Sequence, residues 1–233
     1  MPGASAPRAL DAGTGVWAIV ATVPAPEYDE PALADGLKNL DWVGRRAIAH
    51  EGVVEHFLSA AAVLPMQLFT LFTADERALE HVRRDRTRIN RILRRLEGQL
   101  EWGLRLTFDE KSALTDSAER RKPSGSAYLA RKRDQLDLAR VRLTEARADA
   151  NRLYRAMSRE ATEARRRPSI DAAAPGSRLL LDAAFLAPRG RSAAFRSALR
   201  RNARKLGARG IVVSLTGPWP PYNFIASPRS RRP

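Results

Sequence analysis

The sequence contains no cysteine among its 233 residues, which excludes disulfide bonds, thiolate zinc sites and cysteine nucleophiles. It also lacks an uninterrupted run of about eighteen apolar residues, the length expected of a membrane-spanning helix. The first 14 residues are small and polar. Without an apolar core of roughly 7–15 residues they do not form a secretory signal, and we expect them to be disordered. Because a hydrophobic content of 44% suffices for one large or two small cores, we expect a soluble, cytoplasmic protein.

Motifs for catalysis or cofactor binding are absent as well. His50 and His56 stand six residues apart, which places them about 240° apart on a helix, whereas a helical zinc pair is separated by about four residues. The segment Gly13–Ala18 matches a loose dinucleotide-binding pattern, but it precedes a predicted strand when it should follow one. We therefore expect no catalytic residue, no metal and no cofactor, and a protein that is not an enzyme. His50 is predicted to form a hydrogen bond at a helix end.

Lysine is scarce although the chain is strongly basic. Only five of its 41 basic residues are lysine, and the net charge is +15 with an isoelectric point near 11.3. The arginines are spread over most of the predicted helices, which is typical of solvated helix faces. Short clusters occur only at Arg165–Arg167 and in the tail at Arg229, Arg231 and Arg232. These clusters carry the alternative hypothesis, a basic protein that binds nucleic acid.

Apolar patterning predicts an α+β unit in the first half of the chain. Residues 16–23 are apolar and rich in β-branched side chains, which favours a central strand buried on both faces. Residues 63–71 are a second strand candidate, with Pro65 at an edge or bulge. Apolar and polar residues alternate over 102–108 and predict a half-buried strand. Helices are expected at residues 30–62, as two helices broken near Gly44 or Gly52, and at residues 75–99 with Thr73 as N-cap. A polar linker is expected at residues 111–124.

A long helix is predicted over residues 125–167, which contain no proline or glycine after Gly125. Apolar residues repeat at seven, as in a coiled coil. One register holds Leu129, Leu136, Leu143, Ala150 and Met157, and the other holds Ala139, Ala146 and Leu153. At about 1.5 Å per residue such a helix would measure roughly 60 Å, longer than a small domain is wide. Part of it therefore projects or meets a partner, or the whole helix packs across its own domain.

The chain ends in a second α+β region with an unusual terminal arm. Strands are predicted at residues 179–187 and 211–215, around a helix at residues 192–206. The second strand is expected to stop at Gly217-Pro218. Pro218, Pro220 and Pro221 then predict a stiff extended arm that carries Trp219, Tyr222 and Phe224. Two interpretations stay open: the arm folds back and covers the protein's own core, or it is a rigid aromatic hook for a partner.

The segment Thr216–Phe224 resembles the C-terminal signature of the gas vesicle protein F/L family, whose members are accessory proteins of gas vesicle assembly. The resemblance extends over most of residues 16–224, with further matches in the family's order. The matching positions that we interpret as structural are His50, Pro65, Gly125, Tyr128, Gly217, Pro218, Pro220 and Pro221. Two departures stand out: Met66–Phe69 replace a basic residue and a Phe-Gly pair, and few residues separate Val23 from His50. The first sheet is therefore expected to be reduced.

The resemblance implies an α+β fold in two regions. We expect a reduced ferredoxin-like N-terminal α+β domain at residues 15–110, and a C-terminal α+β domain with a long coiled-coil-like helix at residues 125–225, before a disordered basic tail at 226–233. It also implies a non-enzymatic accessory protein, located at the gas vesicle and in the cytoplasm. Such a protein would bind the hydrophobic shell protein and other accessory proteins as a nucleation or chaperone-like factor. The hypothesised partner-binding residues are Trp219, Tyr222, Phe224, Leu136 and Leu143.

Overall fold

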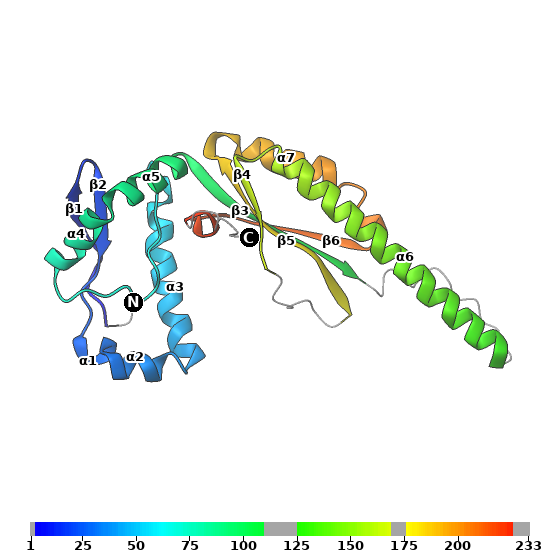
Figure 1. The fold of residues 1–233 in the computed structure, drawn as a ribbon, viewed down its shortest axis with the longest axis horizontal. Coiled ribbons are helices and arrows are strands. Elements are labelled where there is room, and N and C mark those ends of the chain that lie inside the picture. Colours follow the sequence, from blue (N-terminus) through cyan, green and yellow to red (C-terminus); the bar gives the residue numbers. More distant parts are fainter. Residues whose placement is uncertain (1–2, 110–124, 169–175, 226–233) are drawn as a thin grey trace, which may run out of the picture. The chain divides into compact units, whose positions relative to one another are not determined.

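The structure, a computed structural model, describes residues 3–109, 125–168 and 176–225. The chain divides into two compact units (Figure 1). The first unit holds the residues up to Glu97 together with those from Pro220 onward, and the second holds Gly98–Trp219. These boundaries differ from the predicted ones, which end a first domain at residue 110 and place a second at 125–225. The predicted linker and basic tail lie outside the described residues.

The first unit begins with a β-hairpin. Strand β1 (Arg8–Gly13) pairs antiparallel with β2 (Val16–Val20) in a two-stranded sheet. Thr14 and Gly15 connect them with φ angles of 54° and 76°, in the left-handed region. The prediction of disorder over residues 1–14 is wrong for β1. The prediction that residues 16–23 form a central strand is also wrong, because β2 has β1 as its one neighbour in the described sheet.

Helices make up most of the rest of the first unit. They are α1 (Ala25–Tyr28), α2 (Glu30–Gly36), α3 (Leu40–His56), the 3₁₀ turn η1 (Phe57–Ser59), α4 (Asp75–Arg84), α5 (Arg86–Leu96) and the 3₁₀ turn η4 (Tyr222–Phe224). The predicted break near Gly44 or Gly52 falls instead before Leu40, because the Asn39 side chain accepts hydrogen bonds from the N–H groups of Asp41 and Trp42 and so caps α3.

Two further expectations for the first unit are corrected. The predicted single helix over 75–99 is interrupted at Asp85 and preceded by Ala74 as N-cap, not by Thr73. Residues 63–71 form no strand. Pro65 lacks an N–H for a sheet ladder, and Phe69 has a φ of 64°, which no extended strand adopts.

The second unit is built on a four-stranded antiparallel sheet in the order β4-β5-β3-β6. The strands are β3 (Gln99–Asp109), β4 (Glu163–Arg166), β5 (Ser177–Pro188) and β6 (Ile211–Trp219), and the helices are α6 (Gly125–Ser158), η2 (Arg189–Arg191), α7 (Ser192–Ala203) and η3 (Gly207–Arg209). Both α6 and α7 lie along one side of this sheet (Figure 1). The predicted alternation at 102–108 and the strand at 179–187 are confirmed.

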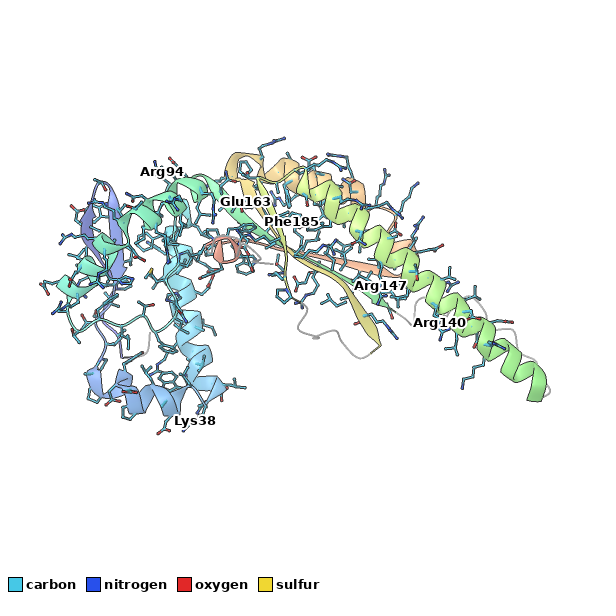
Figure 2. The ribbon with its side chains drawn as sticks, viewed as in Figure 1. Lys38, Arg94, Arg140, Arg147, Glu163 and Phe185 are labelled. Carbon is cyan, nitrogen blue, oxygen red and sulfur yellow. The ribbon has the colours of Figure 1, made fainter. Side chains whose placement is uncertain are left out.

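The core of the second unit lies between the sheet and the two helices. Alternate residues of β3 and β5 belong to it, among them Leu104, Leu106 and Phe185, all with no exposed surface. Figure 2 labels Phe185 on its strand. Phe195 of α7 packs on the rings of Trp102 and Phe185, with centroids 6.0 and 5.8 Å apart. Offset aromatic contacts of this kind add to the stabilisation from buried apolar area.

Two element ends in the second unit differ from prediction. Helix α6 ends at Ser158 and not near residue 167, because residues 163–166 pair with β5. Strand β6 does not stop at Gly217-Pro218, a cis peptide bond, but continues to Trp219, which pairs with Glu101 after a shift in register. Gly217 is required here: its φ is +113°, and a Cβ atom would lie 2.8 Å from the Glu101 carbonyl oxygen.

Candidate functional site

An open cavity of about 1530 Å³ lies in the first unit. Its walls come from the hairpin, α3, the segment at residues 60–74, α4 and α5. The sheet of this unit has two strands, and the segment at residues 60–74 contributes to the lining without forming a strand. Concave apolar sites of this kind are where proteins most often bind ligands and partner segments.

Apolar side chains form most of the cavity lining. From the helices come Val53, Val54, Phe57, Ala78, Val82, Ile89 and Leu93, and from the hairpin and the segment at 60–74 come Val16, Ala18, Val20, Leu64, Pro65 and Phe69. Four large apolar side chains that also line it are substantially exposed: Trp17 at 58%, Met66 at 41%, Leu71 at 41% and Phe72 at 40%. Exposed apolar side chains around an apolar hollow are the usual signature of an interaction site.

A buried arginine and the aromatic rings stacked on it hold one wall of the cavity in place. Arg46 of α3 is only 4% exposed. Its Nε donates a hydrogen bond to the Tyr28 hydroxyl (3.1 Å), and its Nη2 lies 3.5 Å from the Glu27 carboxylate. The guanidinium lies 3.7 Å from the centroid of the Trp42 ring, which in turn stacks on Phe69 at 5.3 Å. The irregular segment is thus tied to α3 through Phe69, without strand pairing.

Polar groups in the cavity lining are mostly paired with the hairpin or with neighbouring helices. Arg8 forms an ion pair with Asp75 at 2.5 Å, and Arg86 donates to the Thr14 hydroxyl at 2.6 Å. His50 also lines the cavity, and its buried Nε2 has no hydrogen-bond partner within the described chain. The prediction that His50 bonds at a helix end is wrong, since it lies inside α3. Across residues 3–109, 125–168 and 176–225, no cluster of acidic or histidine side chains could hold a metal ion.

The terminal arm is part of the first unit from Pro220 onward. Pro220, Pro221 and Phe224 are buried, and Phe224 has no exposed surface. Arg95 of α5 donates a hydrogen bond to the Phe224 carbonyl oxygen, and the Tyr222 hydroxyl donates to the Glu51 carboxylate of α3. The arm therefore folds back on α3 and α5, as the first of the two sequence-based interpretations holds.

The three arm aromatics differ in what they expose. Trp219 is 38% exposed and Tyr222 36% exposed, whereas the ring of Phe224 is inaccessible to a partner. Of the three hypothesised contact residues on the arm, two thus have surface that a partner could reach. Phe224 instead has a structural position.

The hypothesised seam of α6 divides into a buried and an exposed part. Ala146, Ala150, Leu153 and Met157 are buried in the core of the second unit. Leu143 is partly buried against that core, and Leu136 is 55% exposed. Gly125 is the first residue of α6, and Tyr128 and Leu129 also belong to it. In the second half of α6, the heptad pattern therefore results from packing against the core of the same chain.

Arg165–Arg167 form the cluster on which the nucleic-acid hypothesis partly rested, and two of these arginines have acidic partners. Arg165 pairs with Glu163 at 3.4 Å, and Arg167 forms an ion pair with Asp182. The Arg166 guanidinium lies 4.4 Å from the Tyr154 ring centroid. The side chains of Arg165 and Arg167 thus have acidic partners within the second unit. Arg229, Arg231 and Arg232 lie outside the described residues.

Asp149 of α6 is a buried acid of the second unit with a shifted pKa. Its burial by itself would raise the pKa of the carboxyl, but hydrogen bonds from Arg209 and Arg152 outweigh that effect and hold the pKa below its usual value. The contact with Arg209 measures 2.7 Å. This cluster links α6 to η3, so we interpret it as structural.

Most of the residues that line the cavity were not identified from the sequence as a site. The one indication in the sequence was the high content of apolar residues at positions 60–72, which we had interpreted as a strand. None of the described helices is both long enough and apolar enough to cross a membrane.

Comparison with known proteins gives a consistent result. The family model described as gas vesicle synthesis protein GvpL/GvpF matches residues 5–226. Gas vesicle protein L of Streptomyces sp. (strain CB03234) is 34% identical over 232 residues, covering 95% of this chain and 84% of that protein.

Two solved structures share the fold. The crystal structure of gas vesicle protein GvpF from Anabaena sp. PCC7120 superposes with a TM-score of 0.59 at 17% identity, covering 81% of this chain and 77% of the other. That of GvpF from Microcystis aeruginosa gives 0.58 at 12% identity, covering 95% and 89%. The predicted α+β class is confirmed.

Proposed function

The chain belongs to the gas vesicle synthesis protein GvpL/GvpF family and has a role in gas vesicle assembly, and from this premise we propose that it acts as a non-enzymatic factor that binds the hydrophobic shell protein. Binding would keep shell subunits soluble and deliver them to a growing vesicle. A client of this kind exposes apolar surface, which aggregates unless a complementary apolar surface covers it. The partner must therefore offer an accessible apolar site of sufficient size.

The apolar cavity of the first unit is the observation that carries this proposal. Its volume of about 1530 Å³ exceeds the roughly 300–1,000 Å³ typical of small-molecule pockets, and it is open. A groove of this size can receive the apolar face of an amphipathic helix, in which anchors recur at three- and four-residue steps. The exposed side chains of Trp17, Met66, Leu71 and Phe72 would be covered when the client binds.

The arm and the free part of α6 are proposed as secondary contacts, used for other accessory proteins. Trp219, Tyr222 and Leu136 expose apolar surface outside the cavity. Leu143 would contribute only its accessible edge. Phe224 is excluded from this proposal because it is fully buried.

Co-expression with the major gas vesicle shell protein tests the proposal. We expect a larger soluble fraction of shell protein than in its separate expression, and co-purification that persists at high salt, because apolar contacts are not screened. A Trp17→Ala/Phe72→Ser variant should lose both effects. The matched control is Leu40→Ala/Ile48→Ser, since those side chains are 86% and 76% exposed in the same unit but do not line the cavity.

Three results would overturn the proposal. The first is an unchanged soluble fraction with wild-type protein. The second is equal loss in both double variants, which would point to general surface hydrophobicity and not to the cavity. The third is release of the shell protein by moderate salt, which would indicate a contact based on charge.

A further inference from the structure

Helix α7 and the residues beside it carry several positive charges that form no ion pair with a described residue. From residue 183 to the end of the chain the sequence contains no aspartate or glutamate. Six cations of this stretch are exposed on α7 or beside it: Arg191, Arg196, Arg200, Arg201, Arg204 and Lys205. We refer to these six side chains as the α7 basic face.

The spacing of these residues places them on the outer side of the helix. Arg196, Arg200 and Arg204 follow one another at four-residue steps, so they form one row along α7. Phe195, Ala198 and Leu199 occupy the opposite side and are buried in the core of the second unit. Core packing therefore fixes the orientation of the helix and leaves the basic row facing outward.

The α7 basic face is not neutralised within the described chain. None of its six side chains forms an ion pair with a described residue, in contrast to Arg209, which pairs with Asp149 at 2.7 Å. Their polar contacts are limited: Arg200 donates to the Ser197 hydroxyl at 2.8 Å, and Arg196 lies 5.9 Å from the Trp102 ring centroid. Like charges at four-residue steps repel one another, so this arrangement destabilises the isolated helix.

The helix macrodipole accounts for only part of the pattern. Cations are favourable in the last turn of a helix, which explains Arg200 and Arg201. The dipole effect falls off within a turn, so it explains neither Arg191, which precedes the helix, nor Arg196 in its first half. Neither the helix dipole nor an ion pair with a described residue therefore accounts for Arg191 and Arg196.

We propose that the α7 basic face docks an acidic polypeptide segment of another protein, with carboxylates at helical spacing. The planar guanidinium matches a carboxylate with two parallel hydrogen bonds. Carboxylates four residues apart on a helix have the same spacing as Arg196, Arg200 and Arg204. Exposed Ala193 and Ala194 leave room for a second helix to approach closely.

Nucleic acid fits this surface less well. A helix of 12 residues measures about 18 Å, and it presents a convex surface and not a groove that could follow a phosphate backbone. Single strands are held largely by stacking on aromatic rings, but Phe195, the one aromatic residue of α7, is buried. The convex shape of α7 and the burial of its aromatic ring therefore favour carboxylates on a polypeptide.

A labelled peptide tests the proposal directly. The probe is a fluorescein-labelled, alanine-based helical peptide of about 20 residues with glutamates at four-residue steps, and binding to the full chain is followed by fluorescence anisotropy. We expect Arg196→Glu/Arg200→Glu/Arg204→Glu to weaken binding by about tenfold or more, because three exposed pairs become repulsive contacts. Higher salt should weaken wild-type binding in the same direction.

The matched control is Arg45→Glu/Arg83→Glu/Arg91→Glu. These arginines are exposed in the first unit and form no ion pair with a described residue, so the control changes the net charge equally. We expect its binding to stay within about twofold of wild type. Circular dichroism melts of both variants report on folding, and Arg196→Gln/Arg200→Gln/Arg204→Gln provides a milder test if the reversed helix is destabilised.

Three outcomes would overturn the inference. One is the absence of peptide binding by the wild-type chain, and another is equal weakening in the patch and control variants. The third is tighter binding of a 20-base-pair DNA duplex than of the peptide at the same salt concentration, with the same dependence on α7, which would assign the surface to nucleic acid.

Discussion

Phe224→Ala is the substitution that most directly tests the structural role of the terminal arm. The ring is fully buried, and its backbone carbonyl accepts a hydrogen bond from Arg95. Transfer of a buried phenylalanine side chain to water costs about 1.5–3 kcal/mol. The cavity left behind raises the total to about 3–5 kcal/mol. Since small domains are stable by only about 5–15 kcal/mol, this loss is a large fraction of what holds the first unit folded.

Hydrogen exchange followed by mass spectrometry is the appropriate assay, because a chain of two units need not unfold in one step. A loss of about 3 kcal/mol corresponds to exchange that is about 100-fold faster, provided that exchange follows the opening equilibrium. We expect this acceleration in peptides of α3 and α5, while peptides of β3 and β5 keep their wild-type protection. Tyr222→Phe is the control, since it removes only the hydroxyl that bonds Glu51 and should cost about 0.5–1.5 kcal/mol.

Two results would refute this reasoning. Exchange of α5 within about threefold of wild type would mean that Phe224 contributes little to the first unit. Equal acceleration in α5 and β5 would mean that the arm stabilises the whole chain and that the assignment of Pro220 onward to the first unit is wrong.

The remaining predictions concern the second unit. Gly217→Ala should lower the melting temperature, because the positive φ and the close Glu101 carbonyl oxygen would together cost an alanine about 1–3 kcal/mol. An unchanged melting temperature would show that alanine is not strained at this position. Asp149→Asn should cost about 1–2 kcal/mol at pH 7. Because the folded pKa of Asp149 is lowered, its contribution is complete above the unfolded pKa near 3.9 and is lost as pH falls further; urea midpoints of mutant and wild type should therefore converge as the pH falls below about 4. Met157→Ala should cost about 2–5 kcal/mol, whereas Leu136→Ala, at an exposed position, should change the urea midpoint by less than about 0.5 kcal/mol equivalent.

Local patterns predicted the elements of the second unit well. The alternation over residues 102–108 and the apolar run over 179–187 have short-range causes, and both strands form there. Their membership in one sheet depends on pairing between residues more than 70 positions apart, such as Trp102 with Phe185. Sequence periodicity carries no information on such pairing. For this reason residues 102–108 were predicted to belong to the first domain, whereas β3 belongs to the second unit.

The first unit was harder to predict for a different reason. Strand β1 has the sequence RALDAG, which lacks β-branched residues and forms a strand because β2 pairs with it. Residues 63–71 are apolar enough for a strand, but Pro65 and the left-handed Phe69 prevent one. A cavity is a region where packing is incomplete, and no residue pattern indicates incomplete packing.

The candidate surfaces differ in how far the sequence alone indicated them. Trp219 and Tyr222 were identified from composition, although their exposure was not. The α7 basic face was hidden in a chain where arginine is common, yet the absence of acidic residues after Asp182 was readable in the sequence. Net charge alone obscured this local imbalance.

The order of the units along the chain has a consequence for synthesis on the ribosome. The first unit starts at the N-terminus but includes the residues from Pro220 onward, so the second unit is an insertion within it. During translation, Gly98–Trp219 leaves the exit tunnel before the arm does. The nascent first unit therefore lacks the contacts of Pro220 and Phe224 until the arm emerges. A chain cut just before Pro220 would keep every residue of the second unit but leave α3 and α5 without the arm that packs on them.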